Sequence, residues 1–124
     1  MRARLARYLA SLVLVGSLLA SCSGNQGPKA PVYGWGGYDE LVYSMYAKPG
    51  EATPEAQTSQ LSAGIEEATS AGLQAGPGVY AHLGYMHYLT GNVGAARSAF
   101  EQERALYPES AVFVDGLLKQ LGEG

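Results

Sequence analysis

Two histidines are the residues whose types most suggest metal chemistry, and their spacing argues against it. His82 and His87 stand five residues apart within a segment that we expect to be helical. Five residues turn a helix by about 140° net, so the two imidazoles point to different faces. They cannot converge on one ion, as the ligands of a metal site must. We therefore expect no metal site and no cofactor.

Nucleophilic and acid–base groups are equally scattered. A catalytic triad could be composed from a serine, His87 and Asp115. The chain lacks the G-x-S-x-G motif and the strand-turn-helix that would present the serine, so we do not expect such a triad. The pair Glu66–Glu67 and the carboxylate of Glu101 lie on expected helices without an implied apolar pocket, so we expect solvated faces. The sequence thus predicts no catalytic residues, no enzyme and no small-molecule substrate.

Glu103 is the one carboxylate for which we expect a defined contact. It follows Ala96 by seven residues and therefore shares its helical face. We expect its carboxylate to meet the N-terminus of the final helix near Ser110 and Ala111, where unpaired N–H groups favour an anion. The alternative is a rolled helix with Glu103 in solvent.

Charge and length narrow the class of partner. The chain has 124 residues with 8 basic and 11 acidic side chains, a formal net charge of -3. Arg2, Arg4 and Arg7 precede an apolar run, and a chain starting at Cys22 would keep 8 − 3 = 5 basic residues, a balance of 5 − 11 = -6. An acidic chain without a Lys/Arg cluster is not expected to bind nucleic acid. The length allows one small domain.

The N-terminal segment has the layout of a bacterial secretory signal: basic residues, an apolar stretch from Tyr8 to Ala20, and small residues before a cysteine. The stretch is too short to span a bilayer. Leu19–Cys22 resembles the lipobox of bacterial lipoproteins, which implies removal of residues 1–21 and diacylation of Cys22. The alternative is an ordinary cleavage site with a free or buried cysteine. Because Cys22 is the only cysteine, no intrachain disulfide can form.

The resemblance also implies a location. Two or three acyl chains on Cys22 would anchor the protein stably, whereas one holds only marginally. Ser23 follows the cysteine instead of the Asp that resembles an inner-membrane retention signal. For a Gram-negative host, we therefore expect attachment to the outer membrane, facing the periplasm. Residues 22–34 are rich in Gly, Pro and polar side chains and predict a flexible tether, followed by a helical domain over 35–124.

Periodicity and breaks predict only helices. The first spans Tyr38–Lys48 and ends at a Pro-Gly break; the second spans Pro54–Leu73, with Thr53 as its cap. A final helix covers 111–122, capped by Ser110. The bulky stripe of the first helix comprises Trp35, Tyr38, Val42 and Met45, with Tyr43 and Tyr46 off it.

The segment from Gly78 to Pro108 carries the most specific pattern, two helices joined at Gly91-Asn92. It resembles a tetratricopeptide repeat, a helical hairpin of about 34 residues. Gly84 and Ala96 would let the two helices approach closely. The motif positions are Tyr80, Leu83, Gly84, His87, Ala96, Phe100 and Pro108, with Tyr80 and His87 as substitutions.

These segments predict an all-α fold of tetratricopeptide-like antiparallel hairpins with a C-terminal capping helix. Two hairpins fall below the three repeats usually needed for stability, so either the first packs unusually well or a partner completes the stack. The expected core comprises Leu61, Ile65, Tyr80, Leu83, Gly84, Ala96, Phe100, Leu106, Leu117 and Leu121.

Aromatic residues supply the candidate binding surface. Ala81, Tyr85 and Tyr88 follow i, i+4, i+7 spacing, and the resemblance places this face in the concave groove of such repeats. Packing against the preceding hairpin is the alternative, since aromatic stripes commonly lie in cores.

The mature chain also resembles a family of small, uncharacterised bacterial lipoproteins. The resemblance rests on the segments 35–43, 77–92 and 99–113. Genes of that family typically lie beside those for a CsgG-type lipoprotein. The short repeat domain and its acidic charge favour a non-enzymatic protein–protein interaction adaptor, and the gene neighbourhood of the family implies a CsgG-type lipoprotein as the expected partner. The alternative is a chaperone-like or regulatory peptide-binding module.

Overall fold

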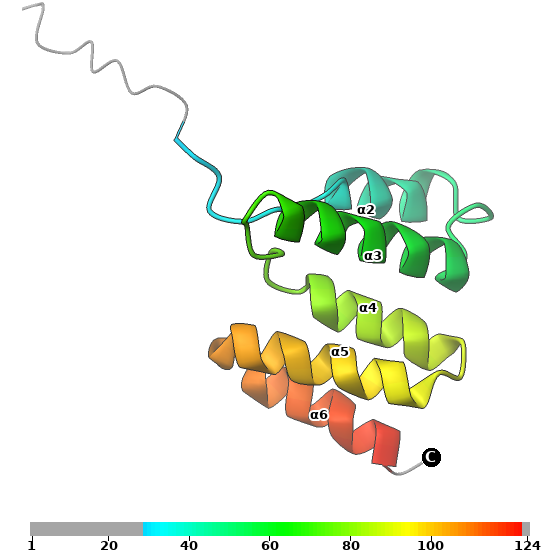
Figure 1. Ribbon diagram of the computed structural model, residues 1–124. Coiled ribbons are helices and arrows are strands. Elements are labelled where there is room, and N and C mark those ends of the chain that lie inside the picture. Colours follow the sequence, from blue (N-terminus) through cyan, green and yellow to red (C-terminus); the bar gives the residue numbers. More distant parts are fainter. Residues whose placement is uncertain (1–28, 123–124) are drawn as a thin grey trace, which may run out of the picture. The chain divides into compact units, whose positions relative to one another are not determined.

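A computed structural model describes residues 29–122 (Figure 1). The expected signal segment, 1–21, and Cys22 lie outside the described residues. The all-α fold is confirmed, and successive helices lie side by side from α2 and α3 to α6 (Figure 1). The elements are α2 (Tyr38–Ala47), α3 (Pro54–Ser70), α4 (Val79–Leu89), α5 (Val93–Leu106), the 3₁₀ turn η2 (Pro108–Ser110) and α6 (Ala111–Gly122).

Local chemistry sets most helix ends. Thr53 Oγ1 accepts a hydrogen bond from the N–H of Ala56 at 3.3 Å, and Pro54 occupies the first helical position of α3, as expected. We expected α3 to reach Leu73, but it ends at Ser70 because Gly72 turns the chain with a φ of 70°.

The chain packs onto the domain slightly earlier than we expected. Gly34 was assigned to the tether, yet its N–H donates to the carbonyl of Gln74 at 2.9 Å, and its carbonyl accepts from Gly76 at 3.2 Å. The Tyr33 ring meets those of Trp35 and Tyr107 edge-on, at centroid distances of 6.2 and 5.9 Å. Ordered packing therefore begins at Tyr33.

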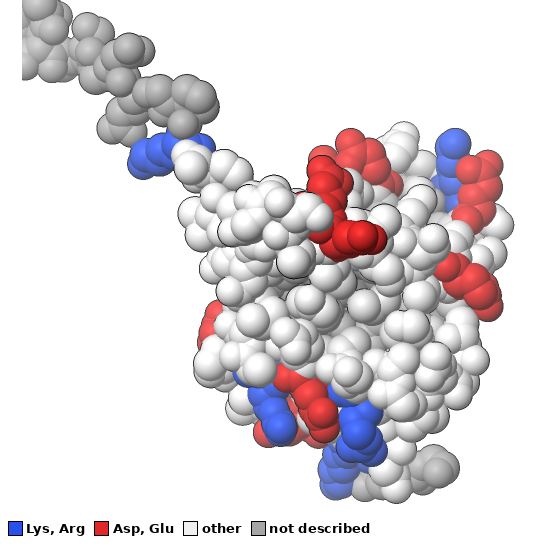
Figure 2. Space-filling view, viewed as in Figure 1, with Lys and Arg blue, Asp and Glu red and all other residues white. Residues whose placement is uncertain are grey.

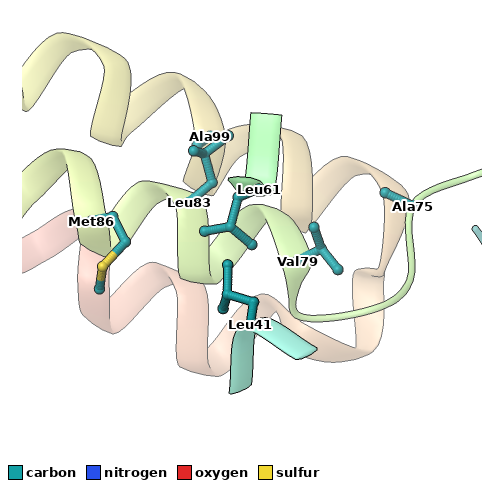
Figure 3. Packing of buried hydrophobic residues seen from close by; sticks show 7 residues of the cluster. All are labelled: Leu41, Leu61, Ala75, Val79, Leu83, Met86 and Ala99. Atoms are coloured by element: carbon teal, nitrogen blue, oxygen red, sulfur yellow. The ribbon is translucent and has the colours of Figure 1, made fainter. Parts of the chain in front are cut away.

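The core consists of two clusters that share α5. The larger one joins α2, α3, α4, the loop before α4 and α5 (Figure 3). The smaller one joins α5 and α6. The larger comprises Leu41, Leu61, Ala75, Val79, Leu83, Met86 and Ala99; the smaller comprises Ala96, Phe100, Val114 and Leu121.

Most of the expected core is buried. Ile65, Tyr80, Leu106 and Leu117 are only partly buried. In α2 the fully buried residue is Leu41, and the expected stripe residues Tyr38, Val42 and Met45 are partly buried and pack against the same cluster. The expected core residues that are buried are Leu61, Leu83, Gly84, Ala96, Phe100 and Leu121.

The expected close approach of α4 and α5 is present. A Cβ added to Gly84 would lie 2.5 Å from two ring carbons of Phe100 and 3.1 Å from the carbonyl oxygen of Ala96. No side chain fits at Gly84 unless the Phe100 ring moves.

Candidate functional site

Tyr85 and Tyr88 lie at the surface of α4. Their side chains remain 46% and 43% exposed, and their ring centroids are 6.4 Å apart with a 30° tilt. They line a shallow, mostly apolar depression together with Phe100, Leu117 and Leu121. That depression is shared with α5 and α6, and neither tyrosine belongs to the cluster that joins α4 to the α2–α3 hairpin. The alternative of packing against the preceding hairpin is therefore wrong.

Ala81, expected on the same open face, is buried. Only 8% of its surface is exposed, and its N–H donates to Glu103. The first turn of α4 is covered by the carboxylate of Glu103 from α5, so the exposed part of the predicted face begins at Tyr85.

Helix α6 extends the exposed apolar surface. Phe113 is 62% exposed and precedes Leu117 by four residues, so both lie on one side of α6. Leu117 lines the depression beside Tyr85. We call the surface formed by Tyr85, Tyr88, Phe113 and Leu117 the aromatic face. Large exposed apolar groups gathered on one side of a small domain are typical of a binding surface.

Glu103 binds the start of α4, not the final helix. Its side chain is 1% exposed; one oxygen accepts from the N–H of Gly78 at 2.7 Å and the other from Ala81 at 3.3 Å. Glycine at the N-cap of α4 supplies no side-chain acceptor, so the carboxylate satisfies these N–H groups instead. Our expectation of contact near Ser110 and Ala111 is wrong, and so is the solvated alternative. The Ser110 hydroxyl donates to the carbonyl of Tyr107 at 2.7 Å.

His82 belongs to a polar network that the sequence analysis missed. Its Nε2 lies 2.9 Å from Gln57 Oε1, and its Nδ1 lies 3.2 Å from the Tyr38 hydroxyl. Gln57 Nε2 donates to the carbonyl of Ala52 at 2.7 Å, which fixes the orientation of the amide. Gln57 Oε1 can only accept, so Nε2 of His82 carries the proton and Nδ1 accepts from Tyr38.

The network ties α2, α3 and α4 together, which makes it structural. Burial lowers the pKa of His82 below its ordinary value of 6.5, and burial raises the pKa of Tyr38. The imidazole is therefore held neutral. A glutamine 25 residues from its histidine has no sequence signature, so only the packing of the helices reveals the pair.

The remaining residues of the repeat motif are Tyr80, His87 and Pro108. Tyr80 and His87 are half-buried and, with α5, line an open groove of about 380 Å³. Pro108 is exposed and begins η2.

Within 29–122 no group of three or more His, Cys, Asp or Glu side chains could hold a metal ion. No helix in that range is long and apolar enough to cross a membrane.

These features define a small all-α domain whose buried polar groups bind its own helices and which exposes one group of aromatic side chains on α4 and α6 and another on α2. The chain belongs to the family described as a domain of unknown function, DUF4810, whose model matches residues 32–117. That match begins one residue before the point at which Tyr33 starts to pack. Searches of curated proteins and of solved structures find no match.

Proposed function

We propose that this protein is a lipid-anchored, non-enzymatic adaptor of the bacterial cell envelope that holds a second envelope protein on its aromatic face. The observation that carries the proposal is the exposure of Tyr85 and Tyr88 at an apolar depression, with Phe113 exposed one turn before Leu117 on α6. A domain this small gains from burying such groups, and these three nevertheless remain in solvent.

The chemistry of tyrosine suits this role. Its ring contributes a large contact area while its hydroxyl stays hydrated, so the unbound face remains soluble. Tyrosine also has few rotatable bonds, so immobilising it costs less entropy than immobilising a long flexible side chain. The two rings already lie 6.4 Å apart on one rigid helix, which reduces that cost further.

The resemblances supply the location and the expected partner. Acylation of Cys22 would hold the domain at the outer membrane, facing the periplasm. The lipoprotein family named above suggests a CsgG-type lipoprotein as partner, and tetratricopeptide-like hairpins are used elsewhere as binding scaffolds. The second candidate is a chaperone-like or regulatory peptide-binding module, and the open groove beside Tyr80 and His87 is the observation that favours it.

The test is in-cell crosslinking followed by purification of the full chain from native membranes. We expect a single stoichiometric partner with the wild type, and loss of most of it with Tyr85→Ser or Tyr88→Ser. Tyr46→Ser is the matched control, because Tyr46 is 83% exposed on α2 and lies away from the aromatic face. Cys22→Ala should release the protein from membranes, and a variant that still partitions with them contradicts the anchor.

Other outcomes separate the candidates. Many unrelated extended clients in place of one partner would support the peptide-binding module. Equal recovery with Tyr85→Ser, Tyr88→Ser and Tyr46→Ser would contradict a role for the aromatic face. Mixing the purified chain with the purified CsgG-type lipoprotein then tests the expected partner directly, by co-elution on size-exclusion chromatography.

A further inference from the structure

A second open surface lies between α2 and α3. The turn before α2 touches α3 closely where the backbones of Gly36 and Gly64 meet, since a Cβ on Gly64 would lie 2.5 Å from the Gly36 oxygen. Along their length, α2 and α3 enclose an open groove of about 570 Å³ that runs from Gly37 to Lys48 on the α2 side. No other helix of the described domain contributes to its lining.

Small residues contribute to the lining of this groove from both sides, namely Gly37 next to α2 and Ala63 and Gly64 on α3. Tyr43, which is 70% exposed, stands on the α2 side. Where the lining has no long side chain, a polypeptide backbone can approach the helices closely. Helix α2 has ten residues and is therefore about 15 Å long, which matches four or five residues of extended chain.

The groove is bordered by carboxylates. Glu40, Glu51 and Glu67 line it, and the only cation in its lining, Lys48, is paired with Glu51 at 3.5 Å. Glu40 and Glu67 lie on opposite helices, so each side of the groove carries a carboxylate whose charge no neighbouring cation in the lining offsets.

The charge of the surrounding hairpin has the same sign. Residues 31–75 contain six acidic side chains and one basic, whereas residues 76–122 contain four acidic and three basic. Figure 2 shows the difference: red side chains gather over α2 and α3, while blue and red alternate over α5 and α6. A field of this sign attracts cations and repels phosphates, nucleic acids and anionic lipid headgroups.

We propose that the α2–α3 groove is a binding site for a short lysine- or arginine-bearing segment of a partner protein. The backbone of the segment lies against Gly37, Ala63 and Gly64, and its cationic groups pair with Glu40 and Glu67. The exposed ring of Tyr43 offers a face for cation–π contact. This site is separate from the aromatic face, so the adaptor would have two attachment points. A partner bound at one site is held at high effective concentration near the other, which raises the overall affinity.

The experiment measures binding of a fluorescein-labelled Lys-Ala-Lys-Ala-Lys peptide to the full chain in non-ionic detergent, by fluorescence anisotropy. A Glu-Ala-Glu-Ala-Glu peptide is the control probe. The test variant is Glu40→Gln/Glu67→Gln, which keeps the side-chain shapes. The matched variant is Glu55→Gln/Glu66→Gln: both residues lie on α3, are exposed, and do not line the groove. Both variants remove two negative charges.

We expect the wild type to bind the lysine peptide and not the glutamate peptide, with affinity that falls as salt rises. Glu40→Gln/Glu67→Gln should weaken binding at least tenfold, and Glu55→Gln/Glu66→Gln less than threefold. Equal losses in the two variants would overturn the site in favour of diffuse charge attraction, and no binding by the wild type would overturn it outright.

Sedimentation velocity tests whether a second copy of this chain occupies the groove instead of a partner segment. A wild-type dimer that dissociates in Glu40→Gln/Glu67→Gln without any peptide would show that a second copy fills the groove and would overturn the proposal. Tyr85→Ser should bind the lysine peptide like the wild type. Failure of this proposal is thus distinguishable from failure of the aromatic face, which the peptide assay does not probe.

Discussion

Replacing Glu103 with alanine tests the central contact of the α4–α5 hairpin. The change removes the acceptors of the Gly78 and Ala81 N–H groups at the start of α4 and leaves a cavity where a fully buried side chain stood. Glycine precedes α4 and carries no side-chain acceptor that could replace the carboxylate. The first turn of α4 should therefore lose both its hydrogen bonds and its packing.

The magnitude follows from the two bonds. A hydrogen bond to a charged group contributes about 1.5–3 kcal/mol; the 2.7 Å contact to Gly78 should reach that range, and the 3.3 Å contact to Ala81 should fall below it. Water can reach the half-buried Gly78 and recover part of the loss. We therefore expect Glu103→Ala to lower the free energy of unfolding by about 2–4 kcal/mol. Glu103→Gln keeps one acceptor oxygen and should cost about 1–2 kcal/mol.

Urea denaturation followed by circular dichroism measures the effect. With a slope of about 1 kcal/mol per molar for a small domain, the Glu103→Ala midpoint should fall by about 2–4 M. Glu101→Ala is the matched control, since Glu101 is exposed two residues earlier on α5, and it should stay within about 0.5 kcal/mol of wild type. Amide exchange at Gly78 and Ala81 should quicken in Glu103→Ala. An unchanged midpoint with unchanged exchange would refute the capping role.

Two further predictions concern the same domain. Gly84→Val should overpack against Phe100, lower the free energy of unfolding by about 1–3 kcal/mol and lower the midpoint of a thermal melt. Gly94→Ala is the control: an added Cβ there meets nothing within 4 Å, so the midpoint should stay unchanged or rise. A Gly84→Val protein as stable as wild type would contradict the close approach of α4 and α5. The folded-state pKa of His82 lies below 6.5, so between those values the unfolded chain binds a proton that the folded chain does not. The free energy of unfolding should therefore fall as pH falls through about 6.5 and level off below the folded-state pKa. In urea melts between pH 7.5 and 5, the free energy of unfolding of His82→Gln should fall less than that of wild type. Parallel curves for the two proteins would show that protonation of the buried imidazole is not linked to folding.

Much of the fold could be predicted because its signals are local. Thr53 and Pro54 mark the start of α3 by capping and by a fixed φ, and the final helix was expected at the residues that α6 occupies. The small volume of Gly84 predicted a close approach that the Phe100 contact confirms. In α2 the expected stripe of Tyr38, Val42 and Met45 packs against the core, but the periodicity did not single out Leu41, the fully buried residue of this helix.

The candidate sites were harder to predict because they depend on how the helices are rolled and crossed. Ala81, Tyr85 and Tyr88 share a face by spacing, yet Glu103 covers the first and leaves the other two exposed. The pairing of His82 with Gln57 also has no counterpart in local sequence.

The sequence by itself determined where the helices and turns lie and that the chain is acidic, because caps, breaks and composition act within a few residues. The tertiary structure alone decided which helix end receives Glu103 and where the acidic side chains border an open groove. The physical reason is angular: each residue advances an α-helix by about 100°, so a small roll of α5 changes which neighbour a side chain meets. The helical face of a carboxylate two turns beyond Ala96 can be predicted, but only the packed helices show that this face meets the N–H of Gly78 at the start of α4.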